Sequence, residues 1–304
     1  MQKLSKAIAR LFLRAFFKPF HGPPFPLGFQ RRWSALIAKT GAGPSDVHEE
    51  ELWSGELRIL RFRATADPAP ADDRDAILFA HGGGFVVSSA ASYANFAGWI
   101  ATTTGADVYV PDYRLAPEHP SPAPTDDLFA AYRTVLGRGH VPERTAILGD
   151  SAGGALAVST ALALREMDVP APAALVLLSP WLDLTLSAPS ITANARRDPM
   201  LRRSWLEQSG RAHAGTLRRA DPRVSPLFAE LRSLPPTLIQ VGSDEILLDD
   251  SVRFADRAWG AGVEVEIQRF EGWWHDFQSA AATLRGAREA LDDVAAFLAR
   301  RFHR

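Results

Sequence analysis

The sequence predicts an α/β fold built on a mostly parallel, doubly wound sheet, on three observations. Short apolar runs alternate with helical segments through most of the 304 residues, as in parallel sheets with right-handed crossovers. Hydrophobic residues make up 46% of the chain, which is enough to fill a sizeable core. Two glycine-rich stretches directly follow predicted strands, where the binding sites of such sheets are built.

The individual elements follow from hydrophobic periodicity and from turn residues. The expected strands are 47–52, 56–64, 77–80, 107–110, 146–148, 174–179, 237–241 and 263–267. The expected helices are 3–18, 30–40, 93–104, 125–136, 155–164, 249–259 and 284–302. We expect the first two strands to form a hairpin and the proline-containing segment 67–75 to be a loop.

The composition argues against several classes of function. The formal net charge is −1, so nucleic acid is not an expected partner. The chain has no cysteine, which excludes a disulfide framework, a thiolate nucleophile and a metal site with Cys ligands. We find no other candidate for a metal site.

The N-terminal segment predicts a basic amphipathic helix. Basic and apolar residues alternate there at helical spacing: Lys3, Leu4, Lys6, Ile8, Arg10, Leu11, Phe12, Leu13, Arg14, Phe16, Phe17 and Lys18. Arg14 interrupts the apolar run, so we do not expect a membrane span. No small-residue cleavage site follows, so we do not expect a signal peptide either. The expected location is cytoplasmic. A helix packed over the body is favoured over a membrane-surface helix, because the proline-rich turn 21–26 leads into more ordered chain.

A G-x-S-x-G pattern formed by Gly149, Ser151 and Gly153 lies between a predicted strand and a predicted helix. Glycines permit the sharp turn that pushes a serine hydroxyl out above the sheet. One match to this pattern is weak on its own. The stretch His81-Gly82-Gly83-Gly84-Phe85 strengthens it, because glycines after a strand let the backbone approach a ligand closely. Backbone N–H groups of Gly83, Gly84 and Ala152 are the predicted oxyanion hole.

A serine nucleophile needs a base within hydrogen-bond reach and a carboxylate that orients the base. Three histidines follow Ser151 in the chain. His303 lies at the chain end, and His213 falls in the irregular region 185–226. We therefore predict His275, in the loop before the final helix, as the base.

The predicted acid is Asp244, which follows the strand 237–241 through a Gly-Ser pair. That position is at the carboxyl end of a strand, where such sites form. Glu245, Asp249 and Asp250 are rivals, although the last two are explained as acids at a helix N-terminus. Asp150 is interpreted as a structural residue of the serine turn.

These motifs in combination resemble the hormone-sensitive-lipase branch of the α/β-hydrolases. The resemblance runs from about residue 75 to the end and rests on 81–85, 113–118, 149–154, 179–184, 221–227, Asp244, and His275 with Phe277. It implies an α/β-hydrolase fold with an eight-stranded sheet and a helical cap. On this basis the body comprises 46–184 and 226–304, and the cap comprises 1–45 and the inserted segment 185–225.

The resemblance also implies a serine carboxylesterase that needs no cofactor and acts on small esters of short or medium acyl chains. The alternatives are hydrolysis of a lactone or an acetylated metabolite by the same triad, a non-catalytic ligand receptor, a peptidase, and acyl transfer to an alcohol. Trp273 and Trp274 resemble residues of a lactone-hydrolase subgroup. A homodimer paired through sheet edges is expected by analogy alone. Most cap aromatics are expected to pack between cap and body, with one or two touching substrate; the set is Phe12, Phe16, Phe17, Phe20, Phe25, Phe29, Trp33 and Trp205.

Overall fold

The protein is built around one eight-stranded sheet in a computed structural model that describes residues 2–65 and 74–302. The strands are β1 (Val47–Ser54), β2 (Leu57–Ala64), β3 (Ala76–Ala80), β4 (Asp107–Pro111), β5 (Thr145–Asp150), β6 (Ala174–Leu178), β7 (Thr237–Gly242) and β8 (Val265–Phe270). Their order is β1-β2-β4-β3-β5-β6-β7-β8. The predicted hairpin of β1 and β2 is confirmed, β2 is antiparallel to β4, and the other neighbours are parallel. The predicted fold class is therefore confirmed.

The helices surround this sheet. They are α1 (Gln2–Phe12), η1 (Leu13–Phe17), α2 (Leu27–Ala38), α3 (Ala90–Thr104), α4 (Ala123–Gly137), η3 (Pro142–Arg144), α5 (Ala152–Glu166), α6 (Ser190–Ala193), α7 (Arg203–Ala214), η4 (Pro226–Phe228), α8 (Leu248–Gly260), η5 (Phe277–Ala280) and α9 (Arg285–Ala299). The expected helix 3–18 is α1 continued by the π-helical turn η1. None of the helices in the described ranges combines the length and apolarity needed to cross a bilayer.

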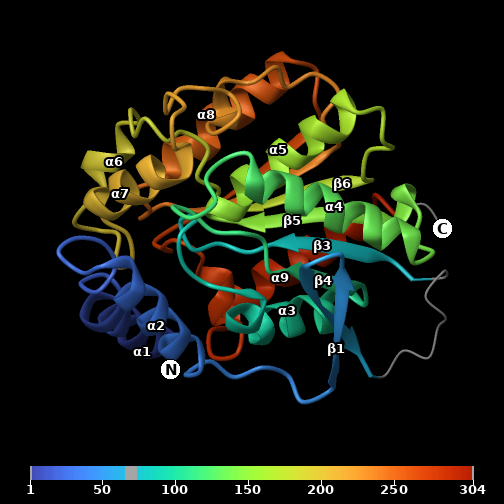
Figure 1. Cartoon of the computed structure of the whole chain (residues 1–304). Coiled ribbons are helices and arrows are strands. Elements are labelled where there is room, and N and C mark those ends of the chain that lie inside the picture. The colour runs from blue at the N-terminus through green and yellow to red at the C-terminus, as the bar shows by residue number, and fades with distance from the viewer. Residues whose placement is uncertain (1, 66–73, 303–304) are drawn as a thin grey trace.

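Helices cover both faces of the sheet (Figure 1). Helices α3 and α9 lie on one face, and α4, α5 and α8 lie on the other. The alternation of side chains along β3 shows why two cores form. Ile77 and Phe79 pack in the cluster that contains α3 and α9, whereas Leu78 and Ala80 pack in the cluster that contains α4, α5 and α8. All four side chains are fully buried.

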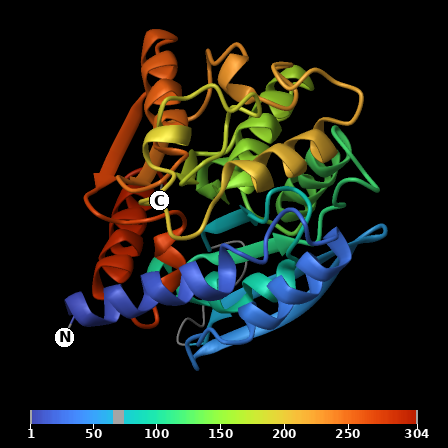
Figure 2. The ribbon, with the colours of Figure 1, turned by 90° about the vertical axis from the view of Figure 1, so that its left-hand side faces the viewer.

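Two segments far apart in sequence meet at one end of the sheet. Helices α1 and α2 lie beside α6 and α7 in both ribbon views (Figures 1 and 2). His21 stacks on Phe17 with 3.9 Å between ring centroids and lies 5.0 Å from the Trp205 ring of α7. The guanidinium of Arg202 donates to the carbonyls of Pro19, His21 and Pro23. Most of the loop expected at 67–75, and also His303, lie outside the described residues.

Candidate active site

Ser151 occupies the turn between β5 and α5 in a strained backbone conformation. Its φ is 51° and its ψ is −119°, which costs a non-glycine residue on the order of 1–3 kcal/mol. The flanking glycines are required: a Cβ on Gly149 would meet the Gly153 carbonyl, and one on Gly153 would meet the Ala80 carbonyl. The turn places the hydroxyl at the carboxyl end of the sheet, in the wall of a cavity.

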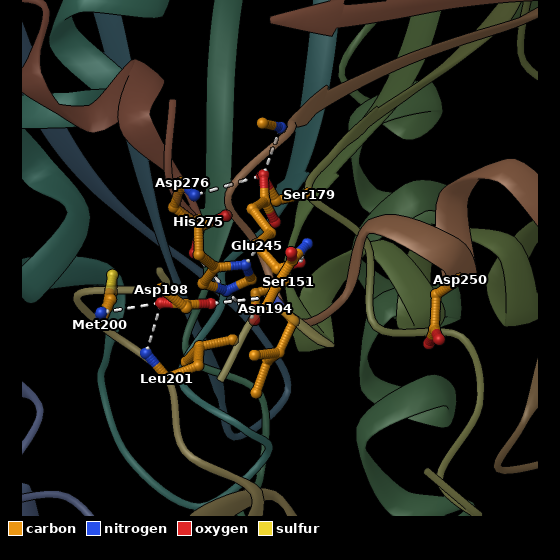
Figure 3. Close-up of polar contacts among 12 residues, drawn as sticks. Ser151, Ser179, Asn194, Asp198, Met200, Leu201, Glu245, Asp250, His275 and Asp276 are labelled. Carbon is orange, nitrogen blue, oxygen red and sulfur yellow. Dashed lines mark hydrogen bonds and ion pairs between the residues drawn. The ribbon is translucent and has the colours of Figure 1, made fainter. Parts of the chain in front are cut away.

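Ser151, His275 and Glu245 form a hydrogen-bonded chain (Figure 3). His275 Nε2 lies 2.8 Å from Ser151 Oγ, and His275 Nδ1 lies 3.0 Å from Glu245 Oε2. All three side chains are buried. They lie in the turns and loops that follow three different strands, β5, β8 and β7. This arrangement lets the imidazole take a proton from the serine hydroxyl while the carboxylate orients the ring.

The structure does not bring Asp244 to His275, and the sequence-based choice of Asp244 is corrected here. The Asp244 carboxylate pairs with Arg10 of α1, with 2.6 Å between Oδ2 and Nη1. Its backbone N–H donates to the Trp273 carbonyl at 3.0 Å. The chain turns sharply after β7, so consecutive side chains leave it in different directions. Asp244 therefore faces the N-terminal helix, and Glu245, one of its rivals, faces the histidine.

Glu245 is held by donors from the end of β7, which leads into it, and from the segment that follows the neighbouring strand β6. Its Oε1 accepts from the Gly242 N–H at 2.5 Å and from the Ser179 hydroxyl at 2.7 Å. The Asn194 side-chain amide donates to the Glu245 carbonyl oxygen at 2.8 Å. Ser179 and Asn194 were missed from the sequence as parts of the site, because only the fold brings them next to Glu245 (Figure 3).

The carboxylates around His275 set the protonation of its ring. Burial disfavours the charged ring, but the nearby carboxylates of Asp276 and Glu245 outweigh this effect and raise the pKa of His275 well above 6.5. Burial raises the pKa of Glu245, against the hydrogen bonds from His275, Ser179 and Gly242. The site therefore stabilises an imidazolium at the moment when the ring holds the serine proton.

Asp276 is a second carboxylate at the histidine, and the sequence analysis did not single it out. Its Oδ2 lies 3.1 Å from His275 Nε2, the nitrogen that faces Ser151. The residue has a left-handed backbone with φ of 52°, and its N–H donates to Ser179 Oγ at 3.1 Å. Asp276 lines the cavity beside Ser151 and is 7% exposed.

Three backbone N–H groups near Ser151 have no acceptor in the described part of the chain: those of Gly83, Gly84 and Ala152. Gly83 and Gly84 have φ of 114° and 61°, which favour glycine. A Cβ on Gly83 would meet the Val87 carbonyl. Two of the three predicted oxyanion donors thus lie in a loop that has no room for a side chain at position 83, and the third, Ala152, begins α5.

Asp150 joins this glycine loop to the serine turn. Its carboxylate accepts from the Gly82 N–H at 2.7 Å and from the Tyr93 hydroxyl at 2.7 Å. The Tyr113 hydroxyl donates to the His81 carbonyl at 2.6 Å on the same loop. Burial raises the pKa of Asp150 well above its ordinary value. These contacts agree with a structural role for Asp150.

A cavity of about 180 Å³ adjoins Ser151 and His275, and a groove of about 700 Å³ shares several residues with it. Phe17 and Trp205 are the two cap aromatics in the cavity wall, and Phe12 and Phe17 line the groove. Other cap aromatics stack on one another, with Phe20 lying 4.6 Å from Trp33 and Phe25 4.8 Å from Phe29 between ring centroids. Three of the eight cap aromatics therefore line the cavity or the groove, one more than the one or two that were expected to touch substrate.

Comparison with known proteins agrees with the fold. The family described as alpha/beta hydrolase fold matches residues 77–279, more than half of the chain. An esterase of Acinetobacter venetianus is 40% identical over 243 residues, covering 79% of this chain and 80% of the relative. An acetyl-hydrolase of Streptomyces hygroscopicus is 36% identical over 231 residues, which cover 76% of this chain and 77% of the relative. The crystal structure of an esterase from the bacterial hormone-sensitive lipase family has a TM-score of 0.91 and 34% identity, covering 100% of this chain and 99% of that one.

The fold and the relatives together define a carboxylic ester hydrolase. The chain belongs to the α/β-hydrolase family, in its branch similar to hormone-sensitive lipase.

Proposed function

We propose that this protein is a serine carboxylesterase that hydrolyses short- to medium-chain esters through an acyl-enzyme. The observation that carries the proposal is the chain of hydrogen bonds from Ser151 through His275 to Glu245, buried at the wall of a cavity. A serine, a base bonded to it and a buried acid behind the base are the parts that acyl transfer needs.

In the proposed mechanism, His275 Nε2 takes the Ser151 proton as Oγ attacks the ester carbonyl carbon. The carbonyl oxygen becomes an oxyanion and accepts hydrogen bonds from the N–H groups of Gly83, Gly84 and Ala152. The imidazolium then protonates the leaving alcohol as the C–O bond breaks. Water, deprotonated by the same nitrogen, attacks the acyl-enzyme and restores the serine. Glu245 fixes the tautomer of His275 and stabilises its imidazolium form.

The sizes of the two spaces support the choice of acyl length. The cavity of about 180 Å³ beside Ser151 accommodates a small acyl group, and the adjoining groove of about 700 Å³ has room for a longer chain or for the alcohol part. Phe17, Phe96 and Met200 are among the residues that line both spaces, so apolar side chains form much of the connection between them. Such a lining favours the hydrocarbon parts of an ester over charged groups.

The proposal is tested by hydrolysis of p-nitrophenyl esters from acetate to palmitate, with an aliphatic lactone in parallel. We expect the highest kcat/KM between acetate and octanoate. Rapid quenching followed by mass spectrometry should find the acyl group on the peptide that contains Ser151. Cleavage of the lactone alone would move the substrate class to lactones, and absence of any hydrolysis would overturn the enzymatic assignment to this site.

The oxyanion loop gives a prediction for Gly83→Ala. The new methyl group would meet the Val87 carbonyl and displace the loop, so we expect kcat to fall by about 10²- to 10³-fold, as when one oxyanion donor is lost. Gly105→Ala is the matched control, because Gly105 also has a positive φ, of 72°, but open space around it. Steady-state kinetics and melting temperatures of both variants check this. Equal kinetic losses in the two variants would contradict a role for the loop in catalysis.

The carboxylate of Asp276 gives a prediction for pH dependence. General-base catalysis needs neutral His275, so kcat/KM falls as pH drops below the raised pKa of that ring. Asp276→Asn removes a negative charge that favours the imidazolium, so the pKa of His275 falls and the acid limb moves to lower pH by about one pH unit or more. Asp126→Asn, on α4, is the control. An acid limb that stays in place in Asp276→Asn would show that Asp276 does not set the protonation of the base.

A further inference from the structure

Helix α1 packs on the protein with its basic side inward. Arg10 pairs with Asp244, and Lys6 Nζ lies 3.9 Å from the centroid of the Trp273 ring. Further along, Lys18 Nζ donates to the Asp198 carbonyl oxygen at 2.6 Å. The long cationic side chains therefore anchor the helix, as the sequence-based preference for packing requires. Within the described residues, this anchoring leaves the opposite, apolar side of the helix largely exposed.

The outward side of this region exposes large apolar side chains. On α1, Leu4, Ile8 and Leu11 are 67%, 59% and 68% exposed, at the i, i+4, i+7 spacing of one helix face. On α2, Phe29 and Leu36 are 37% and 54% exposed. Figure 2 shows the two helices next to each other across the viewer's side of the molecule. We call the face formed by these five residues the cap face.

The segment that carries the cap face has a strongly positive charge. Residues 1–45 contain eight Lys or Arg and no Asp or Glu, so they carry +8, and the rest of the chain carries −9 within a net charge of −1. Among the basic side chains described there, Arg10 and Arg31 contact carboxylates. Arg32 and Lys39 are exposed on the same side of α2 as Leu36, at helical spacing. Exposed apolar residues beside exposed cations are typical of surfaces that bind anionic lipid.

The cap face adjoins the substrate region. Ile8, at the edge of the face, also lines the groove of about 700 Å³, together with Phe12 and Leu13 of the same segment. The groove reaches His275. A lipid surface in contact with the cap face would therefore lie next to an apolar entrance to the candidate active site.

We propose that the cap face docks on an anionic lipid surface. A second copy of the chain fits less well, because a two-fold interface would set one +8 segment against another. A lipid surface accounts for both the exposed apolar side chains and the basic residues. Acyl chains would contact the apolar side chains, and anionic headgroups would pair with the cations. Binding to lipid is independent of ester hydrolysis, so the proposal stands or falls separately from the proposed function.

The test is co-sedimentation of the full chain with vesicles of phosphatidylglycerol and phosphatidylcholine, and with phosphatidylcholine alone. We expect binding to the anionic vesicles that weakens as NaCl rises from 50 to 500 mM. The variant Leu4→Gln/Leu11→Gln/Leu36→Gln should reduce the partition coefficient by about tenfold or more. It should keep its activity on p-nitrophenyl acetate, because these three side chains line neither the cavity nor the groove.

The control variant is Val141→Gln/Met167→Gln/Val252→Gln, which removes three exposed apolar side chains from the body and should bind as the wild type does. Three results would overturn the proposal: no sedimentation of the wild type with anionic vesicles, equal binding of the cap-face variant, or equal binding to phosphatidylcholine alone. Light scattering would give a fourth result that overturns it. If the wild type is a dimer and the cap-face variant is a monomer, the face binds a second copy of the chain instead of lipid.

Discussion

Ser151→Ala is expected to lower kcat for p-nitrophenyl acetate by about 10⁶-fold, as does loss of the nucleophile in comparable serine hydrolases. Without Oγ, no acyl-enzyme can form, and only water positioned near the free N–H groups of Gly83 and Ala152 can react. The backbone at 151 keeps φ near 51° in this variant, so the fold loses one hydrogen bond to His275 and little else. We expect the free energy of unfolding to change by about 1 kcal/mol or less.

Two measurements check this expectation: steady-state kinetics and chemical denaturation of the same preparation. Ser159→Ala, on α5 and lining neither the cavity nor the groove, controls for loss of a serine on the same helix and should retain full activity. A Ser151→Ala enzyme with more than a few per cent of wild-type kcat would remove Ser151 from the mechanism.

Glu245→Gln is expected to lower kcat by about 10⁴-fold, the effect of replacing the acid of a triad by its amide. Glu245 Oε1 already accepts from Gly242 and Ser179. A glutamine that keeps these two bonds must turn its NH₂ toward His275 Nδ1. That nitrogen must then accept a hydrogen bond, which leaves the proton on Nε2, where the ring can no longer take one from Ser151.

Asp244→Asn is the matched control for the neighbouring position. It breaks the ion pair with Arg10, a partly exposed contact whose loss costs about 1 kcal/mol or less, and should leave kcat within a few-fold. The two variants together decide between the assignment made from the sequence and the one made from the structure. A large loss of kcat in Asp244→Asn with a small loss in Glu245→Gln would restore Asp244 as the acid.

The elements of the site that depend on local chain geometry could be predicted from the sequence. Ser151 could be found because a sharp strand-to-helix turn needs small residues at 149 and 153, and this requirement is visible as a motif. Gly83 and Gly84 could be proposed because glycines after a strand let the backbone approach a ligand closely, and this pattern is also visible in the sequence. His275 was found because few histidines follow the serine and only one lies in a loop after a predicted strand.

The parts of the site that depend on side-chain direction could not be predicted. Asp244 and Glu245 are adjacent and equally acidic, and the spacing from β7 does not say which one turns inward. Asp276 is next to the histidine in sequence, but its carboxylate reaches Nε2 only because the backbone at 276 is left-handed. The contacts of Ser179 and Asn194 with Glu245 join segments more than 50 residues apart.

The sequence by itself determined the fold class and singled out the proposed nucleophile, base and oxyanion loop, because each lies in a short run with its own periodicity, glycine pattern or place after a strand. Only the tertiary structure decided which acid meets the base, which aromatics reach the cavity and which side of α1 faces outward. The physical reason is the same in all three cases. Local sequence sets where the backbone turns, but the direction in which a side chain points depends on the packing of elements that are distant in the chain.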